Sequence, residues 1–274
     1  MSYKANPHRY QDSKFEAVIT CWNYGDFLAE TLPFAISQLD RVVVVTDHED
    51  SLTRGICDRW SVECIGTDAF SEKGDTFNKG SGINLGLAAL RQQGWLIQLD
   101  ADIVLPPQFR NMIDKSGLQR DCIYGAERFN VCGWERWRKL KADLHTDPQF
   151  NYRYLVSTPA DLPIGSHVVH KERGYTPIGF FQMWHSQYMH EHQLRYPEVE
   201  GTAENMDVQW ALRWPRKDRV LLPSVRLFHL ESEPALMGAN WNGRKTKPFT
   251  HDGTALPIPK TSGGYGYGYK GYAS

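Results

Sequence analysis

Residues 95–104 read Trp-Leu-Ile-Gln-Leu-Asp-Ala-Asp-Ile-Val, and this stretch decides the fold that we predict. An apolar run ends at Leu99, and two carboxylates, Asp100 and Asp102, follow with one residue between them. A short apolar run after a helical pattern is typical of a buried strand in an open α/β sheet. Ligands of such sheets bind beyond the carboxyl ends of the strands, and two buried acids need a positive partner, such as a divalent cation. We therefore expect a metal-dependent site here, the alternative being a turn with solvated carboxylates.

The chain before this stretch alternates between strand-like and helix-like segments. Asp26 is expected to be the N-cap of the first helix, because acidic residues are favoured there. The alternation predicts right-handed β-α-β units and a Rossmann-like sheet of mainly parallel strands. A nicotinamide cofactor is not expected, because no GxGxxG follows the first strand. The expected strands are residues 15–20, 41–46 and 62–65, and the expected helices are residues 27–39, 51–60 and 77–93.

The second half of the sequence is less regular. Residues 128–144 mix tryptophans with arginines and lysines, and residues 145–175 have the prolines of a loop. From Glu231 onward the pattern is loop-like, and the Gly/Tyr-rich residues 263–269 form a low-complexity tail. In this half the expected strands are residues 121–126, 178–184 and 220–230, and the expected helix is residues 205–214.

Composition limits the classes of protein to consider. The chain has 274 residues, 41% of them hydrophobic, so it can bury a substantial core. Its formal net charge of -1 gives no sign of a strongly polyanionic partner. The five cysteines lack CxxC or zinc-finger spacing and are expected to be reduced thiols. Since we find no signal peptide and no apolar run that could span a bilayer, a cytoplasmic location is expected.

Polar residues recur in a characteristic order at the ends of the expected strands and in the following loops. In chain order these residues are Thr20 to Asn23, Asp47, Asn78 to Gly80, Asn84, Asp100 to Asp102, Glu204 to Arg213, His229 and Asn240 to Lys245. With this series, residues 15–247 resemble the GT-A fold glycosyltransferases, and in particular their inverting, family-2-like branch. The resemblance rests on the whole series, because an Asp-x-Asp motif alone is common.

The resemblance implies a GT-A fold, an α/β architecture in which helices flank a mixed, mostly parallel central sheet. It implies a single catalytic domain over residues 1–274. Residues 14–118 would form the half that binds the nucleotide sugar, and residues 119–232 the acceptor and catalytic half. Residues 233–274 would be an irregular segment that supplies a loop-like lid and the Gly/Tyr-rich tail.

The resemblance also implies the reaction, which is transfer of a hexosyl or pentosyl group from a nucleotide sugar, expected to be a UDP-sugar, to an acceptor hydroxyl. Departure of the nucleoside diphosphate builds negative charge on the β-phosphate, and a bound Mn²⁺ or Mg²⁺ stabilises that charge as a Lewis acid. By resemblance, Asp102 is the direct metal ligand and His229 the third protein ligand. Asp100 lies toward the ribose or a metal-bound water.

Other positions would bind the donor. Lys79 and Arg244 are candidates for the pyrophosphate, because cationic side chains neutralise it. Arg244 and Lys245 could also close over the donor as a lid, although plain surface charge is an equal alternative. By resemblance, Asp47 contacts the base or the ribose. The remaining donor-site residues that the resemblance implies are Thr20, Trp22, Asn23 and Ala101.

Inverting transfer needs a base that takes the proton from the acceptor hydroxyl. Related enzymes carry an acidic pair at the start of a helix, with an arginine six residues after the second acid. Asp207 and Arg213 have this spacing, so Asp207 is the candidate base, the alternative being an acid that the helix dipole favours. Met206 stands where the first acid is expected, and Glu204 could substitute for it. Gln182 is assigned to the acceptor side.

Two other functions remain open from the sequence, a sugar nucleotidyltransferase and a non-catalytic module that binds nucleotide sugars. The first would need a Gly-rich basic loop after the first strand, and Thr20 to Asn23 is not such a loop. A saccharide is the default acceptor. A hydroxylated DNA base is also possible, because residues 128–141 interleave aromatic and basic side chains. The alternative for residues 128–141 is an amphipathic helix that covers the sheet.

Overall fold

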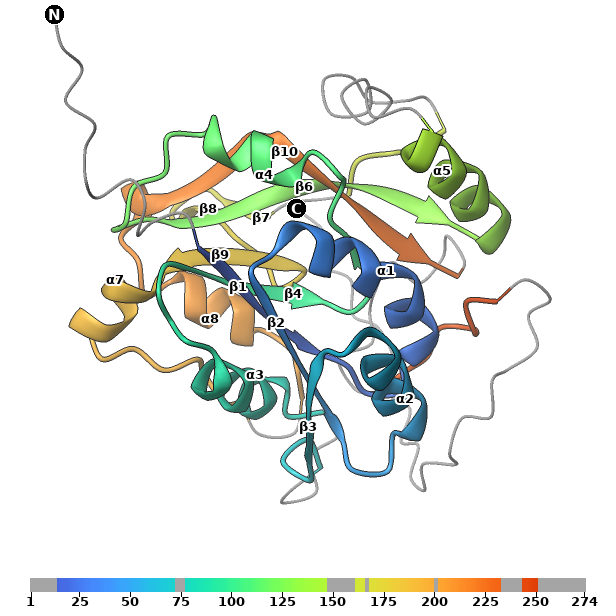
Figure 1. The fold of residues 1–274 in the computed structure, drawn as a ribbon. Helices are drawn as coiled ribbons and strands as arrows, with labels where there is room; N and C mark the ends of the chain where they lie inside the picture. The colour runs from blue at the N-terminus through green and yellow to red at the C-terminus, as the bar shows by residue number, and fades with distance from the viewer. Residues whose placement is uncertain are drawn as a thin grey trace, which may run out of the picture.

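A mixed eight-stranded sheet forms the centre of the molecule in the computed structural model (Figure 1). The structure describes residues 14–71, 77–146, 161–165, 168–199, 202–232 and 243–250. The strand order is β3-β2-β1-β4-β9-β6-β10-β5. The strands are β1 (Phe15–Thr20), β2 (Arg41–Asp47), β3 (Glu63–Thr67), β4 (Trp95–Asp100), β5 (Ile103–Val104), β6 (Ile123–Cys132), β9 (Phe181–His185) and β10 (Arg219–Glu231). A separate hairpin consists of β7 (Val168–His170) and β8 (Gly174–Thr176).

The mixed, mostly parallel sheet is confirmed. Neighbours from β3 to β4 run parallel, and so do β6 and β10. Two of its strands, β9 between β4 and β6 and β5 beside β10, run antiparallel to their neighbours. Strands from both expected halves of the chain therefore share one sheet. The division of the chain into functional halves stays a prediction.

Helices cover both faces of the sheet. The helical elements are α1 (Gly25–Gln38), α2 (Ser51–Trp60), α3 (Lys79–Ala89), α4 (Phe109–Asp114), α5 (Trp134–Thr146), α7 (Ser186–Glu191), α8 (Met206–Ala211) and the 3-10 turn η4 (Arg216–Asp218). On one face, α1 and α2 pack their apolar side chains on alternate residues of β1 and β2. On the other face, α3 and α8 pack on the intervening residues. None of the helices in the described ranges is long and apolar enough to cross a membrane.

The sequence misjudged three of these elements. The first helix begins at Gly25 with Tyr24 as its N-cap, so the expected cap Asp26 lies instead in the first turn, where its carboxylate binds other groups. The expected strand at residues 121–126 continues to Cys132 as β6. Its second half carries polar residues between apolar ones, so the apolar pattern indicates only the first half of the strand. The hairpin of β7 and β8 lies at residues 168–176, whereas we expected a loop over residues 145–175.

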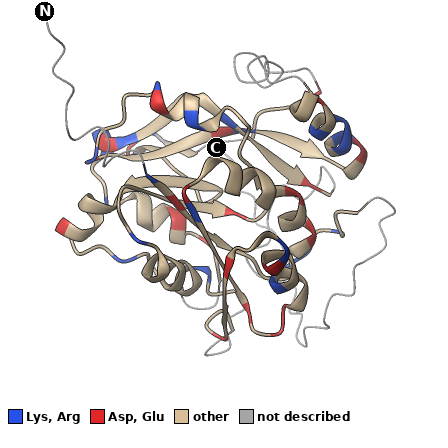
Figure 2. Ribbon diagram, in the orientation of Figure 1, with Lys and Arg blue, Asp and Glu red and all other residues tan. Residues whose placement is uncertain are grey.

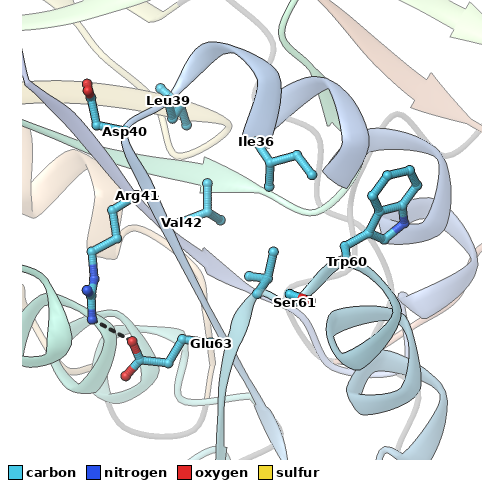
Figure 3. A pocket seen from close by; sticks show the side chains of 9 residues that line it. Ile36, Leu39, Asp40, Arg41, Val42, Trp60, Ser61 and Glu63 are labelled. Atoms are coloured by element: carbon cyan, nitrogen blue, oxygen red, sulfur yellow. Dashed lines mark hydrogen bonds and ion pairs between the residues drawn. The ribbon is translucent and has the colours of Figure 1, made fainter.

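A pocket of about 390 Å³ opens at the end of the sheet where β2 and β3 begin (Figure 3). Trp60 and Val42 are among its lining residues, and so are Arg41 and Glu63, which form an ion pair of 2.5 Å. Strands β1, β2 and β4 run parallel, so their carboxyl ends lie at the opposite edge of the sheet. This pocket is therefore separate from the predicted functional residues.

Candidate functional site

Two predicted metal ligands, Asp102 and His229, are brought together by the pairing of β5 with β10. His229 pairs with Ile103, and the Leu230 N–H donates to the Asp102 carbonyl oxygen at 2.9 Å. His229 Nε2 lies 3.3 Å from Asp102 Oδ2, and both side chains are buried. The pair combines a carboxylate with an imidazole, a donor set that suits Mn²⁺ better than Ca²⁺.

Glu231 is a further acid beside Asp102 and His229, and the sequence pattern does not reveal it. We call these three residues the metal corner. Glu231 Oε1 lies 3.0 Å from His229 Nδ1, and the residue is only 3% exposed. Because His229 and Glu231 are two residues apart on β10, both point to the same face of the sheet. A carboxylate beside the second ring nitrogen usually orients a metal-ligating histidine. The available signal, a His-x-Glu spacing on a strand, is too common to be interpreted alone.

Charge interactions in this corner shift the pKa values of both predicted ligands. Burial lowers the pKa of His229, but the interactions with Asp102 and Glu231 outweigh it, and the pKa is raised. Burial acts to raise the pKa of Asp102, but His229, Arg128 and Lys79 outweigh it, and that pKa is lowered. Asp102 is therefore held as a carboxylate, the form that binds a cation.

The arrangement fits a divalent cation that binds together with a ligand. Asp102 Oδ1 is buried and has no hydrogen-bond partner, so its lone pairs are available. Within the described residues, no group of three or more His, Cys, Asp and Glu side chains is placed to hold a metal alone. A cation bound by few protein groups is commonly completed by waters and nucleotide phosphates. Asp102 and His229 fit that role.

Asp100 has different partners from Asp102. Its Oδ1 accepts hydrogen bonds from Lys79 Nζ and, at 2.9 Å, from Gln98 Nε2. Burial raises the pKa of Asp100, Lys79 opposes this effect, and Asp102 adds to it. Lys79 is placed by Asn78, which caps α3 and accepts from the Ser81 N–H. The expected roles of Asp100 at the metal and the ribose stay predictions.

Gly179 connects Lys79 with the predicted base, Asp207. The Gly179 carbonyl oxygen accepts from Lys79 Nζ at 3.4 Å, and its N–H donates to Asp207 Oδ2 at 2.6 Å. A Cβ at this position would lie 3.0 Å from Asp207 Oδ2, so any side chain would crowd the carboxylate. Asp207 Oδ1 accepts from the Val208 N–H at 2.8 Å. The carboxylate is thus held in one orientation at the start of α8.

Gln182, predicted on the acceptor side, lies beneath the predicted base. Its Nε2 donates to the carbonyl oxygens of Asp207 and Pro177, each at 2.9 Å. Its Oε1 accepts from the Tyr196 hydroxyl at 2.8 Å. These bonds use the amide to support α8 in the structure. A contact of Gln182 with the acceptor stays a prediction.

The residues around Asp207 explain the departure from the family pattern. Met206 is 1% exposed and packs in the apolar cluster under α8, where an acid would be costly to bury. Glu204 is half-buried in the turn before the helix, and Arg213 is exposed after the helix ends. The substitution of Glu204 for the missing acid stays a prediction.

The loop after β1 lies beside Asp100. Thr20 pairs with Asp100 in the sheet, and its buried Oγ1 has no hydrogen-bond partner. Trp22 stacks on Phe70 with ring centroids 5.8 Å apart. Asn23 adopts a φ of 58°, a left-handed conformation that asparagine tolerates. The structure thus brings this loop to the carboxyl end of β4, and its donor contacts stay predictions.

Two further predicted donor residues are engaged by the protein itself. Asp47 ends β2, and its Oδ1 accepts from the Glu49 N–H at 2.9 Å. Ala101 is buried, and its carbonyl oxygen accepts from Thr31 Oγ1 at 2.6 Å. Both residues lie at the carboxyl ends of their strands. Their contacts with a donor stay predictions.

Arg244 is bound to the start of α1. Its Nη1 and Nη2 lie 2.6 and 2.7 Å from the two carboxylate oxygens of Asp26, a buried bidentate pair. Nη1 also donates to the Asn23 carbonyl oxygen at 2.7 Å, and the guanidinium lies over the ring of Tyr24. Lys245, beside it, is exposed. The guanidinium is thus occupied by the protein, and the contacts of both residues with a pyrophosphate stay predictions.

Comparisons with known proteins place this arrangement in a family. The sequence model of glycosyl transferase family 2 matches residues 16–174, which is more than half of the chain. Among solved structures, a glucosyl-3-phosphoglycerate synthase from Mycobacterium tuberculosis, in complex with Mn²⁺, uridine diphosphate and glucosyl-3-phosphoglycerate, is 11% identical, with a TM-score of 0.47. That match covers 88% of this chain and 82% of that one.

A mannosyl-3-phosphoglycerate synthase from Rubrobacter xylanophilus is 17% identical, with a TM-score of 0.34, over 42% of this chain and 40% of that one. Comparison with curated proteins gives no match. The match over residues 16–174 includes Asp100 and Asp102, and the sheet has the expected GT-A form. The chain therefore belongs to glycosyl transferase family 2, and it is a glycosyltransferase that uses a nucleotide-sugar donor.

Proposed function

We propose that the protein transfers a sugar from a UDP-sugar to an acceptor hydroxyl, with inversion at the anomeric carbon and with Mn²⁺ or Mg²⁺ as cofactor. The observation that carries this proposal is the position of Gly179, which binds Asp207 through its N–H and Lys79 through its carbonyl oxygen. A direct displacement needs the base and the groups that bind the leaving diphosphate around one sugar. The bonds at Gly179 support such an arrangement.

The chain's own residues have distinct tasks on the donor side. Asp102 and His229 would hold the cation, which when bound stabilises the charge on the departing diphosphate. Glu231 would keep the imidazole in the orientation that binds metal. Lys79, bound to Asp100 near this corner, would add a fixed positive charge close to the pyrophosphate.

Asp207 would act on the acceptor side as the general base. Its Oδ2 is anchored by the Gly179 N–H and its Oδ1 by the Val208 N–H, so the carboxylate does not have to be ordered when the acceptor binds. The same carboxylate would accept the proton of the acceptor hydroxyl as that oxygen attacks the anomeric carbon. Gln182 supports the backbone of this residue from below.

For the acceptor, we propose a saccharide or another small hydroxyl compound before a nucleic acid. Trp137, Leu140 and Leu144 of α5 are buried against β6 and β10, so the helix covers the sheet with its apolar face. Figure 2 marks the Lys and Arg residues of this helix, of which Arg136, Arg138 and Lys139 are exposed and Lys141 is half-buried. Two of them form ion pairs, Lys141 with Glu30 and Arg138 with Glu135, and Arg136 donates to the Asp161 carbonyl oxygen. These contacts favour an amphipathic helix that covers the sheet over a surface that binds a nucleic-acid strand.

The reaction can be tested with a panel of nucleotide sugars. We expect a UDP-sugar to release nucleoside diphosphate in the presence of Mn²⁺, with chelator abolishing the release and added Mn²⁺ restoring it. Product nucleotide can be measured by chromatography, with GDP-, ADP- and CMP-sugars in the same panel. Absence of binding and turnover for every donor with metal present would refute the proposed function. Turnover that persists in excess chelator would refute the metal requirement.

Replacement of Glu231 by Gln should weaken metal binding while preserving the shape of the corner. Mn²⁺ affinity in the presence of UDP is expected to fall by about 10- to 100-fold, because the imidazole of His229 loses a negative partner. Titration calorimetry measures this affinity. Glu63→Gln is the matched control, because Glu63 pairs with Arg41 at the edge strand β3. Equal Mn²⁺ affinity in both variants would show that Glu231 does not orient the histidine.

A further inference from the structure

Arg128 of β6 is a buried cation that the proposed reaction has not yet used. The residue is 9% exposed, and its Nε has no hydrogen-bond partner. Among the described residues, no carboxylate forms an ion pair with its guanidinium, which rests over the ring of Phe180 at 4.5 Å. Burial lowers the pKa of Arg128, whereas Asp102, Asp100 and Glu231 act to raise it. A buried arginine without a bound anion is costly, so the protein keeps it at the expense of stability.

The position of Arg128 in the sheet directs it toward the candidate site. Residues two apart on a strand share a face, so Arg128 and Asn130 of β6 lie on one face. Asn130 is paired with His229 of β10, which places both side chains on the face that carries the metal corner. Asn130 is 4% exposed, and its Oδ1 also has no hydrogen-bond partner. A donor and an acceptor group are therefore both left unsatisfied on this face.

Gly165 allows the chain to cover these two side chains. Its N–H donates to the Arg128 carbonyl oxygen at 2.8 Å, so the backbone lies directly beside β6. A Cβ on Gly165 would lie 2.7 Å from Arg128 Nε and 3.0 Å from Asn130 Oδ1. Glycine thus leaves both polar groups where they are, whereas a side chain would push the guanidinium aside.

We propose that Arg128 and Asn130 form a subsite for the acceptor, in which the guanidinium binds a phosphate or carboxylate group and Asn130 binds a hydroxyl. This inference rests on the proposed function, since it assumes that the acceptor lies on the Asp207 side. Phe180, under the guanidinium, directly follows Gly179, whose N–H binds Asp207. Lys79 at the start of α3 and Asp102 in the turn between β4 and β5 would, by contrast, serve the donor side. The acceptor is thereby assigned to the class of anionic hydroxyl compounds.

Inorganic phosphate is the probe for this subsite, measured by calorimetry on protein saturated with Mg²⁺ and UDP so that the diphosphate position is filled. Arg128→Met is expected to weaken phosphate binding by about tenfold or more, because a charge-assisted pair is lost. Arg128→Lys should keep part of the affinity, since it retains the charge without the planar fork. Arg226→Met is the matched control, because Arg226 lies on β10 and is already paired with Glu127.

The measurements separate the competing explanations. Equal phosphate affinity of wild type and Arg128→Met, or no measurable phosphate binding by wild type, overturns the subsite. Loss of UDP affinity as large as the loss of phosphate affinity means that the guanidinium serves the donor. The positive charge of Arg128 also offsets the nearby carboxylates of Asp102, Asp100 and Glu231, so the melting temperatures of Arg128→Met and Arg128→Lys are measured alongside. Weaker phosphate binding only in step with a lower melting temperature would assign Arg128 a structural role. Because phosphate affinity is measured without turnover, loss of the phosphate subsite can be distinguished from absence of the proposed sugar transfer.

Discussion

Replacement of Asp207 by Asn is expected to reduce sugar transfer by about 10²- to 10⁴-fold, the usual contribution of a general base. The amide retains the shape of the carboxylate, and its oxygen can still accept from the Gly179 N–H, so the start of α8 should stay in place. The amide cannot take the acceptor proton. Affinity for UDP and Mn²⁺ should therefore be nearly unchanged. Transfer is measured with the donor found in the panel, and UDP affinity by calorimetry.

A matched variant distinguishes loss of the base from a general effect of removing a charge. Asp58→Asn changes an exposed residue of α2 and should leave transfer and UDP affinity as in wild type. Parallel losses of UDP affinity, melting temperature and transfer in Asp207→Asn would assign Asp207 a structural role. Transfer at the wild-type rate would exclude it as the base.

Replacement of Asp102 by Ala should remove metal-dependent turnover of the donor. Asp102 supplies the lowered-pKa carboxylate that faces His229, and without it the cation loses its only negative protein ligand in that pair. We expect turnover to fall by about 10³-fold or more, roughly 4 kcal/mol of transition-state stabilisation. Mn²⁺ affinity in the presence of UDP should fall in parallel, as followed by calorimetry.

Two comparisons make the Asp102 result specific. Asp102→Asn preserves the volume of the side chain, so its loss of Mn²⁺ affinity is independent of any cavity left by alanine. Asp114→Ala changes an exposed acid at the end of α4 and should have no effect on turnover. Full activity of Asp102→Ala would show that the metal assignment is wrong.

The first half of the fold follows closely from local patterns. The run at β2 is almost entirely buried, as its β-branched residues predict, and β4 delivers Asp100 to the carboxyl edge of the sheet. These elements are predictable because each is set by a continuous apolar segment between polar turns. The expected family is confirmed by the match over residues 16–174, whereas the role of each site residue stays a prediction.

The second half is harder to predict from the sequence, because its polar residues have partners far away along the chain. Arg128 and Asn130 looked like part of a basic surface segment, yet they lie on the buried face of a strand. The position of Glu231 next to the His229 ring can be interpreted only once β10 is seen to place His229 beside Asp102. Neither arrangement is visible in local periodicity, because strand register and β-strand neighbours across the sheet decide it.

The bidentate pair between Asp26 and Arg244 also affects how the molecule folds. The two residues are 218 positions apart, and Phe249, whose N–H donates to Asp26, packs on Phe27. A ribosome releases the N-terminal strands long before residue 244. During synthesis the Asp26 carboxylate therefore stays without Arg244, and the Phe27 ring stays without Phe249, until that segment has emerged. Contacts of such long range slow folding and prolong exposure to aggregation. The contacts of α1 with this segment therefore form only after residue 249 has been made.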